Sequence, residues 1–259
     1  MTRFVQLFLC LSLLMGSTAT HAERLLIAAA ADLKFAMDEI VVAFLKAHPG
    51  RTVDVVYGSS GKFHTQIQQG GPYDLFFSAD IAFPHMLVAN GHAAAPVSPY
   101  AVGRIVLWSN TMDASKMTLR DLTDSKITRI AIANPKHAPY GKRAVEALQA
   151  AGVWPQVEPK LIYGENIAQT AQFVQTGNAQ VGILALALVL NPRLSDKGRH
   201  WLIPDQLHEP LEQGFVITRH AKDKALAKQF ADFMATPSAR AVLRRYGFAL
   251  PGEASASSR

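Results

Sequence analysis

The sequence predicts an α/β fold made of two Rossmann-like α/β lobes with a ligand cleft between them. Three observations support this prediction. Short apolar runs alternate with helical patterns, the alternation occurs in two series separated by a loop at 93–99, and 259 residues suffice for two small domains. Because alternating strands and helices are typical of α/β units, we expect a mainly parallel sheet in each lobe.

The first series contains three strand-like apolar runs, and a helical pattern follows each of them. In the first helix the apolar side chains fall near one face and most charged side chains lie away from it, so that face should pack on the sheet. The strands are predicted at 25–31, 53–58 and 73–80, and the helices at 32–48, 59–70 and 81–91.

The second series begins with AVGRIVLWS at 101–109, which we interpret as one long strand. Because the chain then crosses between the lobes twice, the interlobe cleft is the expected ligand site. We assign 23–100 and 205–259 to lobe I, 101–204 to lobe II and the small, polar residues 252–259 to a flexible tail. The later strands are predicted at 129–135, 160–166, 181–189, 200–204 and 212–218, and the helices at 141–152, 167–177, 224–235 and 237–247.

Residues 1–22 have the pattern of a secretory signal peptide. Arg3 precedes an apolar run at 4–15, and small and polar residues lead to a cleavage site after Ala22. The run is about half of the roughly 20 residues that a membrane-spanning helix needs. Cleavage would remove Cys10, the only cysteine, and would lower the net charge from +6 by one. We therefore expect a periplasmic, thiol-free mature protein, which excludes disulfides and Cys-based zinc, redox or nucleophilic sites.

Four turns between a predicted strand and the next helix carry the candidate chemistry, because ligands of open α/β sheets gather there. These turns present backbone N–H groups at helix N-termini, and two of them add Ser or Tyr hydroxyls, which suits a small anion. Taken singly, each turn also fits a purely structural role as a helix cap or helix start. The turns are Ala31-Asp32, Gly58-Ser59-Ser60-Gly61, Ala138-Pro139-Tyr140-Gly141 and Gly164-Glu165-Asn166-Ile167.

Motifs of other functional classes are absent from the sequence. It contains no GxxxxGK[ST] motif, which argues against a nucleotide, and no GxSxG elbow around Ser59 and Ser60. The nine histidines include neither HxH nor HExxH, so we predict no metal site. The basic residues are scattered, and we predict no nucleic-acid partner. We therefore expect a binding protein, not an enzyme, with neither catalytic residues nor a cofactor.

At the same turns the sequence resembles the periplasmic molybdate-binding proteins of ABC importers, the ModA family. The resemblance implies the type II periplasmic binding protein fold, molybdate or tungstate as ligand, a membrane ABC permease as partner, and a monomer. It covers about residues 27 to 251 through the strings AAAADLKFAMDEI, YGSSGKFHTQIQQGGPYDLFFSAD, YAVGRIVLWS, IAIANPKHAPYG, GENIAQTAQFVQTGNAQVGILALA and RAVLRRYGFALP.

Carried over by position, the resemblance also implies which residues bind the oxyanion. Ser60 would donate both its hydroxyl and its N–H, whereas Tyr140 and Ile167 would act through their backbone N–H groups. Some members of the family use a tyrosine where this chain has Ala185. The implied ligand residues are Ala31, Asp32, Ser59, Ser60, Tyr140 and Ile167.

Asp32 departs from the family pattern, in which a hydroxyl or amide side chain often occupies the first turn. A carboxylate about 4 Å from a bound anion would cost about 4 kcal/mol per pair of unit charges at an effective dielectric near 20. One interpretation is that Asp32 caps the helix beginning at Leu33 and points away from the ligand. Another is that it accepts a hydrogen bond from a protonated, phosphate-like oxyanion. A third alternative is an enzyme on a related fold, for which Asp32 and His64 are the only candidate bases; His64 otherwise fits a surface helix.

Overall fold

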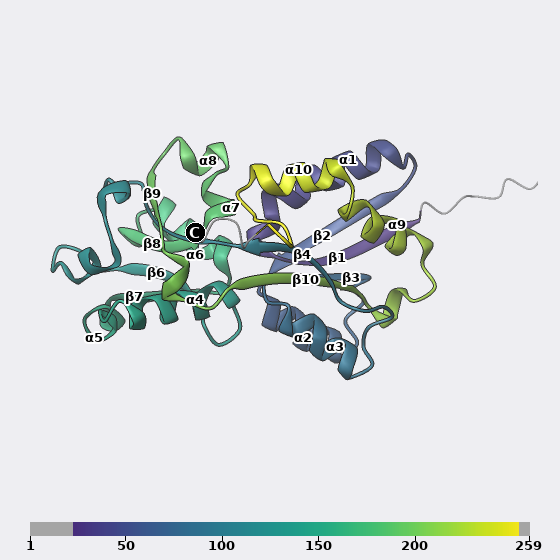
Figure 1. Ribbon diagram of the computed structural model, residues 1–259, viewed down its shortest axis with the longest axis horizontal. Helices are drawn as coiled ribbons and strands as arrows, with labels where there is room; N and C mark the ends of the chain where they lie inside the picture. The colour runs from purple at the N-terminus through teal and green to yellow at the C-terminus, as the bar shows by residue number, and fades with distance from the viewer. Residues whose placement is uncertain (1–22, 254–259) are drawn as a thin grey trace, which may run out of the picture.

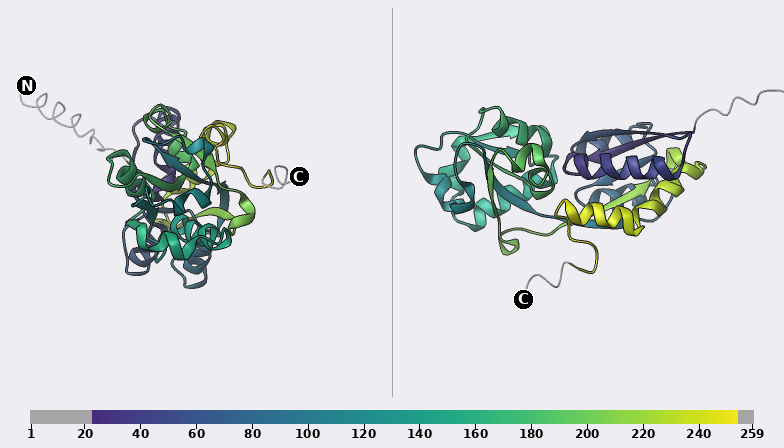
Figure 2. Two further views of the ribbon diagram at one scale, coloured as in Figure 1. Left: turned by 90° about the vertical axis from the view of Figure 1, so that its left-hand side faces the viewer. Right: turned by 90° about the horizontal axis from the view of Figure 1, so that it is seen from above.

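The structure is a computed structural model that describes residues 23–253. Two α/β lobes lie side by side along the long axis of the molecule (Figure 1, Figure 2), and each contains one five-stranded sheet flanked by helices. The predicted fold class is therefore confirmed. The signal peptide predicted for 1–22 lies outside the described residues, as does most of the predicted tail.

The sheet of the first lobe contains β1 (Arg24–Ala30), β2 (Thr52–Gly58), β3 (Leu75–Ser78), β4 (Ser98–Gly103) and β10 (Leu211–Ile217). The strand order is β2-β1-β3-β10-β4. β1 is parallel to β2 and β3, whereas β10 is antiparallel to β3 and β4. The sheet is therefore mixed: β10 runs opposite to the other four strands, which all run in one direction, as expected for a mainly parallel sheet.

Helices cover both faces of the first sheet, with α1 and α10 on one face and α2 and α3 on the other (Figure 1). The helical face predicted to be apolar is buried: Phe44 of α1 packs edge to face on Phe230 of α9, with ring centroids 4.9 Å apart. The helices are α1 (Lys34–Ala47), α2 (Ser60–Gln68), α3 (Ala82–Ala89), α9 (Ala225–Met234) and α10 (Pro237–Arg245).

The second lobe repeats this plan in the strand order β7-β6-β8-β5-β9. Its β6 is parallel to β7 and β8, and its β5 is antiparallel to β8 and β9. Trp108 of β5 is fully buried in its core. The strands are β5 (Ile105–Ser109), β6 (Ile130–Ala133), β7 (Leu161–Gly164), β8 (Val181–Ala185) and β9 (Arg199–Leu202).

The helices of the second lobe are α4 (Pro139–Ala150), α5 (Trp154–Val157), α6 (Ile167–Gln175), α7 (Leu186–Val189) and α8 (Pro192–Ser195). The apolar run at 181–189 is thus a strand only as far as Ala185. Short 3-10 helices are η1 (Ala31–Leu33), η2 (Ala114–Lys116), η3 (Leu119–Thr123), η4 (Glu158–Lys160), η5 (Asp205–Leu207) and η6 (Arg219–Ala221). Within residues 23–253 no helix combines the length and apolarity that a membrane crossing requires.

The chain passes between the lobes at Arg104, and the single strand predicted at 101–109 is wrong. β4 ends at Gly103 in the first sheet and β5 begins at Ile105 in the second. The Arg104 guanidinium donates two hydrogen bonds to the Gly247 carbonyl, at 2.7 and 3.1 Å. This contact fixes the crossing point against the segment that follows α10.

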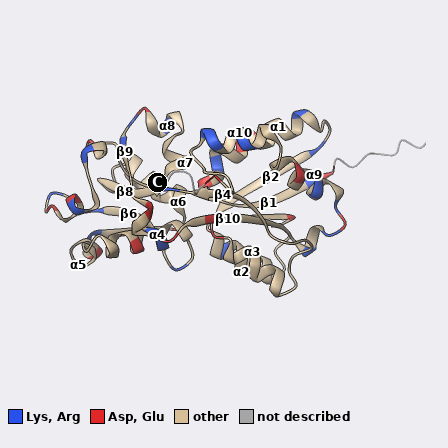
Figure 3. Ribbon diagram, viewed as in Figure 1, with Lys and Arg blue, Asp and Glu red and all other residues tan. Residues whose placement is uncertain are grey.

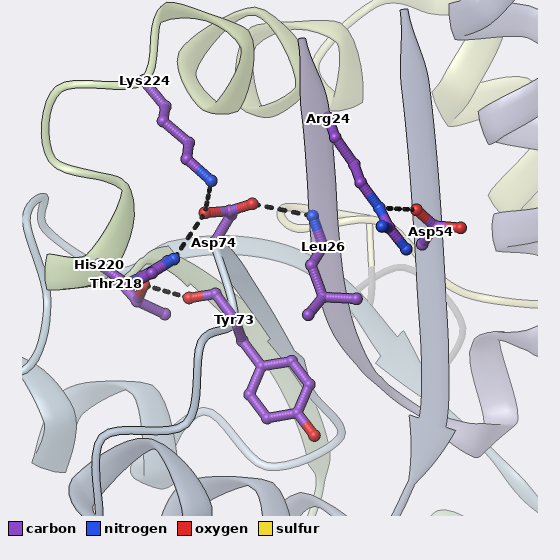
Figure 4. A network of polar contacts seen from close by, with 8 residues as sticks. All are labelled: Arg24, Leu26, Asp54, Tyr73, Asp74, Thr218, His220 and Lys224. Carbon is purple, nitrogen blue, oxygen red and sulfur yellow. Dashed lines mark hydrogen bonds and ion pairs between the residues drawn. The ribbon is translucent and has the colours of Figure 1, made fainter. Parts of the chain in front are cut away.

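A buried carboxylate anchors the amino end of β3 (Figure 4). The Asp74 carboxylate accepts hydrogen bonds from the N–H of Leu26 on β1 at 2.8 Å and from the ammonium group of Lys224 at 2.6 Å. Lys224 is the residue immediately before α9. The Thr218 hydroxyl donates to the Tyr73 carbonyl beside it. The network therefore joins two neighbouring strands and a helix at the end of the sheet opposite to the carboxyl ends of β1 and β3.

Candidate functional site

A small pocket lies between the lobes, at the carboxyl ends of β1, β2, β6 and β7. Its cavity volume is about 10 Å³, far below the roughly 300 Å³ at which pockets for organic ligands begin. All six residues singled out from the sequence line it. The lining consists of Ala31, Asp32, Ser59, Ser60, Tyr140 and Ile167, together with Ala30, Gly58, Ala79, Ala138, Pro139 and Asn166.

Three helix N-termini converge on the pocket, because α2 begins at Ser60, α4 at Pro139 and α6 at Ile167. First-turn N–H groups have no acceptor within their own helix, and the N-terminus of a helix carries partial positive charge. Among the described residues, the N–H groups of Ser60, Tyr140 and Ile167 donate to no protein acceptor. They are therefore available to an anion in the pocket.

Asn166 shows how one of these donors is kept free. Its side-chain oxygen accepts from the N–H groups of Ala168 and Gln169, each at 3.0 Å, as an N-cap residue does. The cap leaves the N–H of Ile167 without a partner. Ile167 can thus contribute to a polar site although its side chain is apolar and buried.

The start of α4 approaches the end of β6 very closely at Gly141. A Cβ at this position would lie 2.6 Å from the carbonyl carbon of Ala133, so only glycine fits. The close approach brings Tyr140, the preceding residue, to the pocket.

The two serines are buried but differ in their partners. The Ser60 hydroxyl oxygen accepts the N–H of Ala79 at 3.0 Å, which leaves its proton for a ligand. The Ser59 hydroxyl lies 3.0 Å from Nδ1 of His137 and so already has a protein partner. Of the two, Ser60 is therefore the better placed to donate its hydroxyl proton to a ligand.

Asp32 does not cap a helix, so that interpretation is wrong. Its Oδ2 accepts hydrogen bonds from the Tyr140 hydroxyl at 3.0 Å and from Nε2 of Gln213 at 2.8 Å. Its Oδ1 is buried and has no partner among the described residues, and the whole residue is 1% exposed. The carboxyl group thus lies at the pocket and joins η1 of the first lobe to α4 of the second.

Burial dominates the electrostatics of this carboxyl group. Desolvation raises the pKa of Asp32 to about 6, and the hydrogen bonds from Gln213 and Tyr140, with nearby backbone N–H groups, offset only part of that rise. Burial likewise raises the pKa of Tyr100 and Tyr140 well above the usual value, and the negative charge of Asp32 adds to this. Both phenols therefore remain neutral donors at physiological pH.

Sequence reasoning missed Gln213 and Tyr100, which complete the network. The Tyr100 hydroxyl donates to Oε1 of Gln213 at 2.6 Å, and the amide of Gln213 donates to Asp32. Gln213 is a fully buried polar residue within β10, and a polar side chain inside an apolar strand is the one signal that could have indicated it. The position of Tyr100 on β4 gave no such signal.

A second set of interlobe contacts lies beside the pocket. Lys62 of α2 forms an ion pair with Glu165 of the second lobe, and Nε2 of His137 lies 3.8 Å from Glu165. The N–H of Gly61 donates to the His137 carbonyl at 2.9 Å. Burial lowers the pKa of His137, and the positive charge of Lys62 also opposes its protonation, whereas Glu165 favours it. We call Ser59, Gly61, Lys62, His137 and Glu165 the interlobe clasp.

The clasp places a serine, a histidine and a carboxylate together, which sequence spacing did not predict. The histidine presents Nδ1 to Ser59 and Nε2 towards Glu165, the reverse of the order in serine hydrolases. Glu165 is also already neutralised by Lys62. These contacts connect the two lobes. His64, the other candidate base, packs on Phe83 with ring centroids 5.3 Å apart and does not line the pocket.

The pocket lining contains no Lys or Arg, and Asp32 is its only charged residue. Basic and acidic residues are instead distributed over both lobes (Figure 3). Within residues 23–253, His, Cys, Asp and Glu form no group of three that could hold a metal ion. Ala185 is buried at the end of β8 and is not part of the lining. The pocket therefore offers neutral donors, three helix N-termini and one carboxyl group.

Two α/β lobes with a small, donor-lined pocket between them define the class of two-lobed solute-binding proteins. The family model for bacterial extracellular solute-binding proteins matches residues 25–249, and the chain belongs to this family. It is 38% identical to the molybdate-binding protein ModA of Rhodobacter capsulatus over 92% of this chain and 93% of that protein. With ModA of Azotobacter vinelandii it shares 36% identity over 90% and 92% of the two chains. The resemblance inferred from the sequence is thus confirmed.

Solved structures agree with these relatives. The periplasmic molybdate-binding protein of A. vinelandii superposes with a TM-score of 0.82 at 32% identity, covering 88% of this chain and 99% of that one. The sulfate-binding protein SubI of Mycobacterium tuberculosis gives a TM-score of 0.72 at 14% identity, which shows a shared fold alone.

Proposed function

We propose that this protein binds a tetrahedral oxyanion, molybdate or tungstate, between its lobes and delivers it to a membrane ABC permease. One observation supports this most directly: the free N–H groups of Ser60, Tyr140 and Ile167 and the Ser60 hydroxyl converge on one pocket. Fixed neutral donors at helix N-termini stabilise an anion without a neutralising cation. The names of the relatives from R. capsulatus and A. vinelandii support the choice of molybdate.

The proposed ligand residues are those inferred from the sequence: Ala31, Asp32, Ser59, Ser60, Tyr140 and Ile167. Their pocket draws on both lobes, so an anion bound there would hold the lobes together. Because the family consists of extracellular solute-binding proteins, we also propose that the protein is exported, with cleavage after Ala22, and acts in the periplasm. We further propose that it acts as a monomer.

A second candidate ligand is a protonated, phosphate-like oxyanion. The unpartnered Oδ1 of Asp32 favours it, because an ionised carboxylate at this place would accept a hydrogen bond from a protonated anion and repel a fully ionised one.

Thermal unfolding in the presence of molybdate, tungstate, sulfate and phosphate tests the proposal. At a free anion concentration 100 times Kd, binding stabilises the folded protein by about 2.7 kcal/mol, which corresponds to roughly 5–10 °C in Tm for a protein of this size. We expect this shift with molybdate and tungstate. No shift with either anion contradicts the proposal, and a larger shift with phosphate supports the second candidate.

A further inference from the structure

The hydrogen-bond network around Asp32 fixes which of its two carboxyl oxygens can carry a proton. The Tyr100 hydroxyl donates to Oε1 of Gln213, which turns the amide nitrogen towards Asp32. That nitrogen also lies 3.2 Å from the Tyr140 oxygen, so the Tyr140 hydroxyl proton points to Oδ2 of Asp32. Oδ2 therefore accepts two hydrogen bonds, and a proton on this carboxyl group must be on Oδ1.

Gly103 makes this network possible. A Cβ at position 103 would contact the Tyr140 hydroxyl and would lie 2.7 Å from Nε2 of Gln213. Because glycine occupies this position on β4, Gln213 of β10 and Tyr140 of α4 can meet at Oδ2 of Asp32. Oδ1 is left as a buried oxygen without a partner among the described residues, on a residue that lines the pocket.

No positive charge compensates Asp32 within the network. The groups that contact or act on its carboxyl group are Tyr140 of α4, Tyr100 of β4 and Gln213 of β10, all neutral, together with the backbone N–H groups of η1. The charged clasp residues Lys62 and Glu165 pair with each other, and His137 contacts Ser59 and Glu165. An ionised Asp32 would therefore face a bound anion with nothing between them to neutralise the repulsion.

We propose that Asp32 binds the oxyanion as a neutral carboxylic acid whose Oδ1–H donates a hydrogen bond to an oxygen of the anion. The proton comes from solvent: one carboxylate, one proton and one oxyanion form one complex, and the proton is released again when the anion leaves. This inference rests on the proposed function and deepens it, since it makes oxyanion binding a proton-coupled step.

The direction in which affinity for the anion changes with pH follows from the protonation state of Asp32 in the protein without ligand. Since burial raises the pKa of Asp32 to about 6, most of the empty protein carries an ionised Asp32 above that pH and must take up a proton to bind. Affinity should fall close to tenfold per pH unit well above pH 6, or roughly 50-fold between pH 6 and pH 8 by linkage. Below pH 6 the affinity should level off.

Titration calorimetry of the full mature protein with molybdate tests this. Measurements at pH 7.5 in two buffers of different ionisation enthalpy report the number of protons taken up, and we expect close to one per anion. Asp32→Asn keeps an oxygen for Tyr140 and Gln213 and places an amide N–H₂ where Oδ1–H would be. We expect this variant to bind molybdate without proton uptake and with the same affinity at pH 6 and pH 8.

The matched control is Asp38→Asn on α1, whose side chain is 51% exposed and lies outside the pocket lining. This variant should retain the proton uptake and the pH dependence of the wild type. Thermal unfolding of the Asp32→Asn protein without molybdate checks that it folds. The number of protons taken up by the wild-type protein tests the inference even if this variant does not fold.

Three outcomes would overturn the inference, and they differ from failure of the proposed function. Wild-type binding without proton uptake at pH 7.5 shows that Asp32 is not protonated on binding. Proton uptake that persists in Asp32→Asn assigns the proton to another group, such as His137 or the anion itself. Binding of phosphate in preference to molybdate, with no proton uptake, shows that Asp32 is an ionised acceptor. If neither molybdate nor tungstate binds between pH 5 and pH 8, the proposed function fails, and this inference fails with it.

Discussion

The hydroxyl of Tyr140 donates a hydrogen bond to Oδ2 of Asp32 at 3.0 Å, across the boundary between the two lobes. Tyr140 lies in the first turn of α4 and Asp32 in η1, next to the two other helix N-termini of the pocket. The contact therefore exists only while the lobes are together. It links one buried carboxyl group to the way the two lobes meet around the pocket.

Ser60→Ala should weaken molybdate binding by about 1–3 kcal/mol, because it removes a hydroxyl donor to a charged ligand. Ser59→Ala is the matched comparison, since the Ser59 hydroxyl already contacts His137, and it should have a smaller effect. Titration calorimetry of both variants measures the difference. Equal affinities for Ser60→Ala and the wild type would show that the hydroxyl does not contact the anion.

Asp32→Asn should stabilise the empty protein at neutral pH. The folded-state pKa of about 6 exceeds the ordinary value of 3.8, so the folded protein binds more protons than the unfolded chain between these pH values. The resulting destabilisation is absent below pH 3.8, grows as pH rises to 6 and is complete above it, at about 3 kcal/mol. Denaturant unfolding at pH 4 and pH 7.5 measures it. A stability difference that is the same at both pH values would contradict the raised pKa.

Ile167→Pro tests whether a backbone N–H binds the anion. Proline is well tolerated at the first position of a helix, but it removes the N–H that Asn166 leaves free. We expect weaker molybdate binding, by about 1–3 kcal/mol, while Ile167→Val retains wild-type affinity. Thermal unfolding of each variant without molybdate shows whether the substitution also weakens the packing of the folded protein. If the proline variant binds as well as the valine variant, the N–H is not a ligand.

Glu165→Gln should loosen the interlobe clasp. It removes the ion pair with Lys62, and since both side chains are partly exposed, the expected loss is at most about 1 kcal/mol. We expect molybdate to dissociate up to about fivefold faster at low salt, with the difference shrinking at high salt. Asp232→Asn breaks an exposed pair with Lys228 on α9 and serves as the control. Unchanged dissociation at low salt would mean that the clasp does not hold the lobes together.

The alternation of strands and helices and the four donor-rich turns could be predicted from the sequence, because each depends on neighbouring residues. Parallel strands end at one edge of each sheet, and the expected ligand cleft lies between the two lobes, so residues as distant in sequence as Ser60 of the first lobe and Ile167 of the second could be expected at one site. Ser60 and Ile167 both line the pocket between the lobes.

Features that depend on tertiary contacts could not be predicted in this way. The apolar run at 101–109 looks continuous, yet Arg104 divides it between two sheets. The direction of Asp32 is set by Tyr140 and Gln213, which are 108 and 181 residues away in sequence. A local cap was the reasonable expectation for Asp32, and the buried network replaced it.

The most direct test is a crystal structure of the protein with molybdate, with diffraction measured at the molybdenum absorption edge. We predict an anomalous difference peak in the pocket, within hydrogen-bond reach of the Ser60 hydroxyl and the N–H groups of Tyr140 and Ile167. A peak elsewhere on the molecule, or no peak at saturating molybdate, would contradict the proposal that this pocket binds the oxyanion.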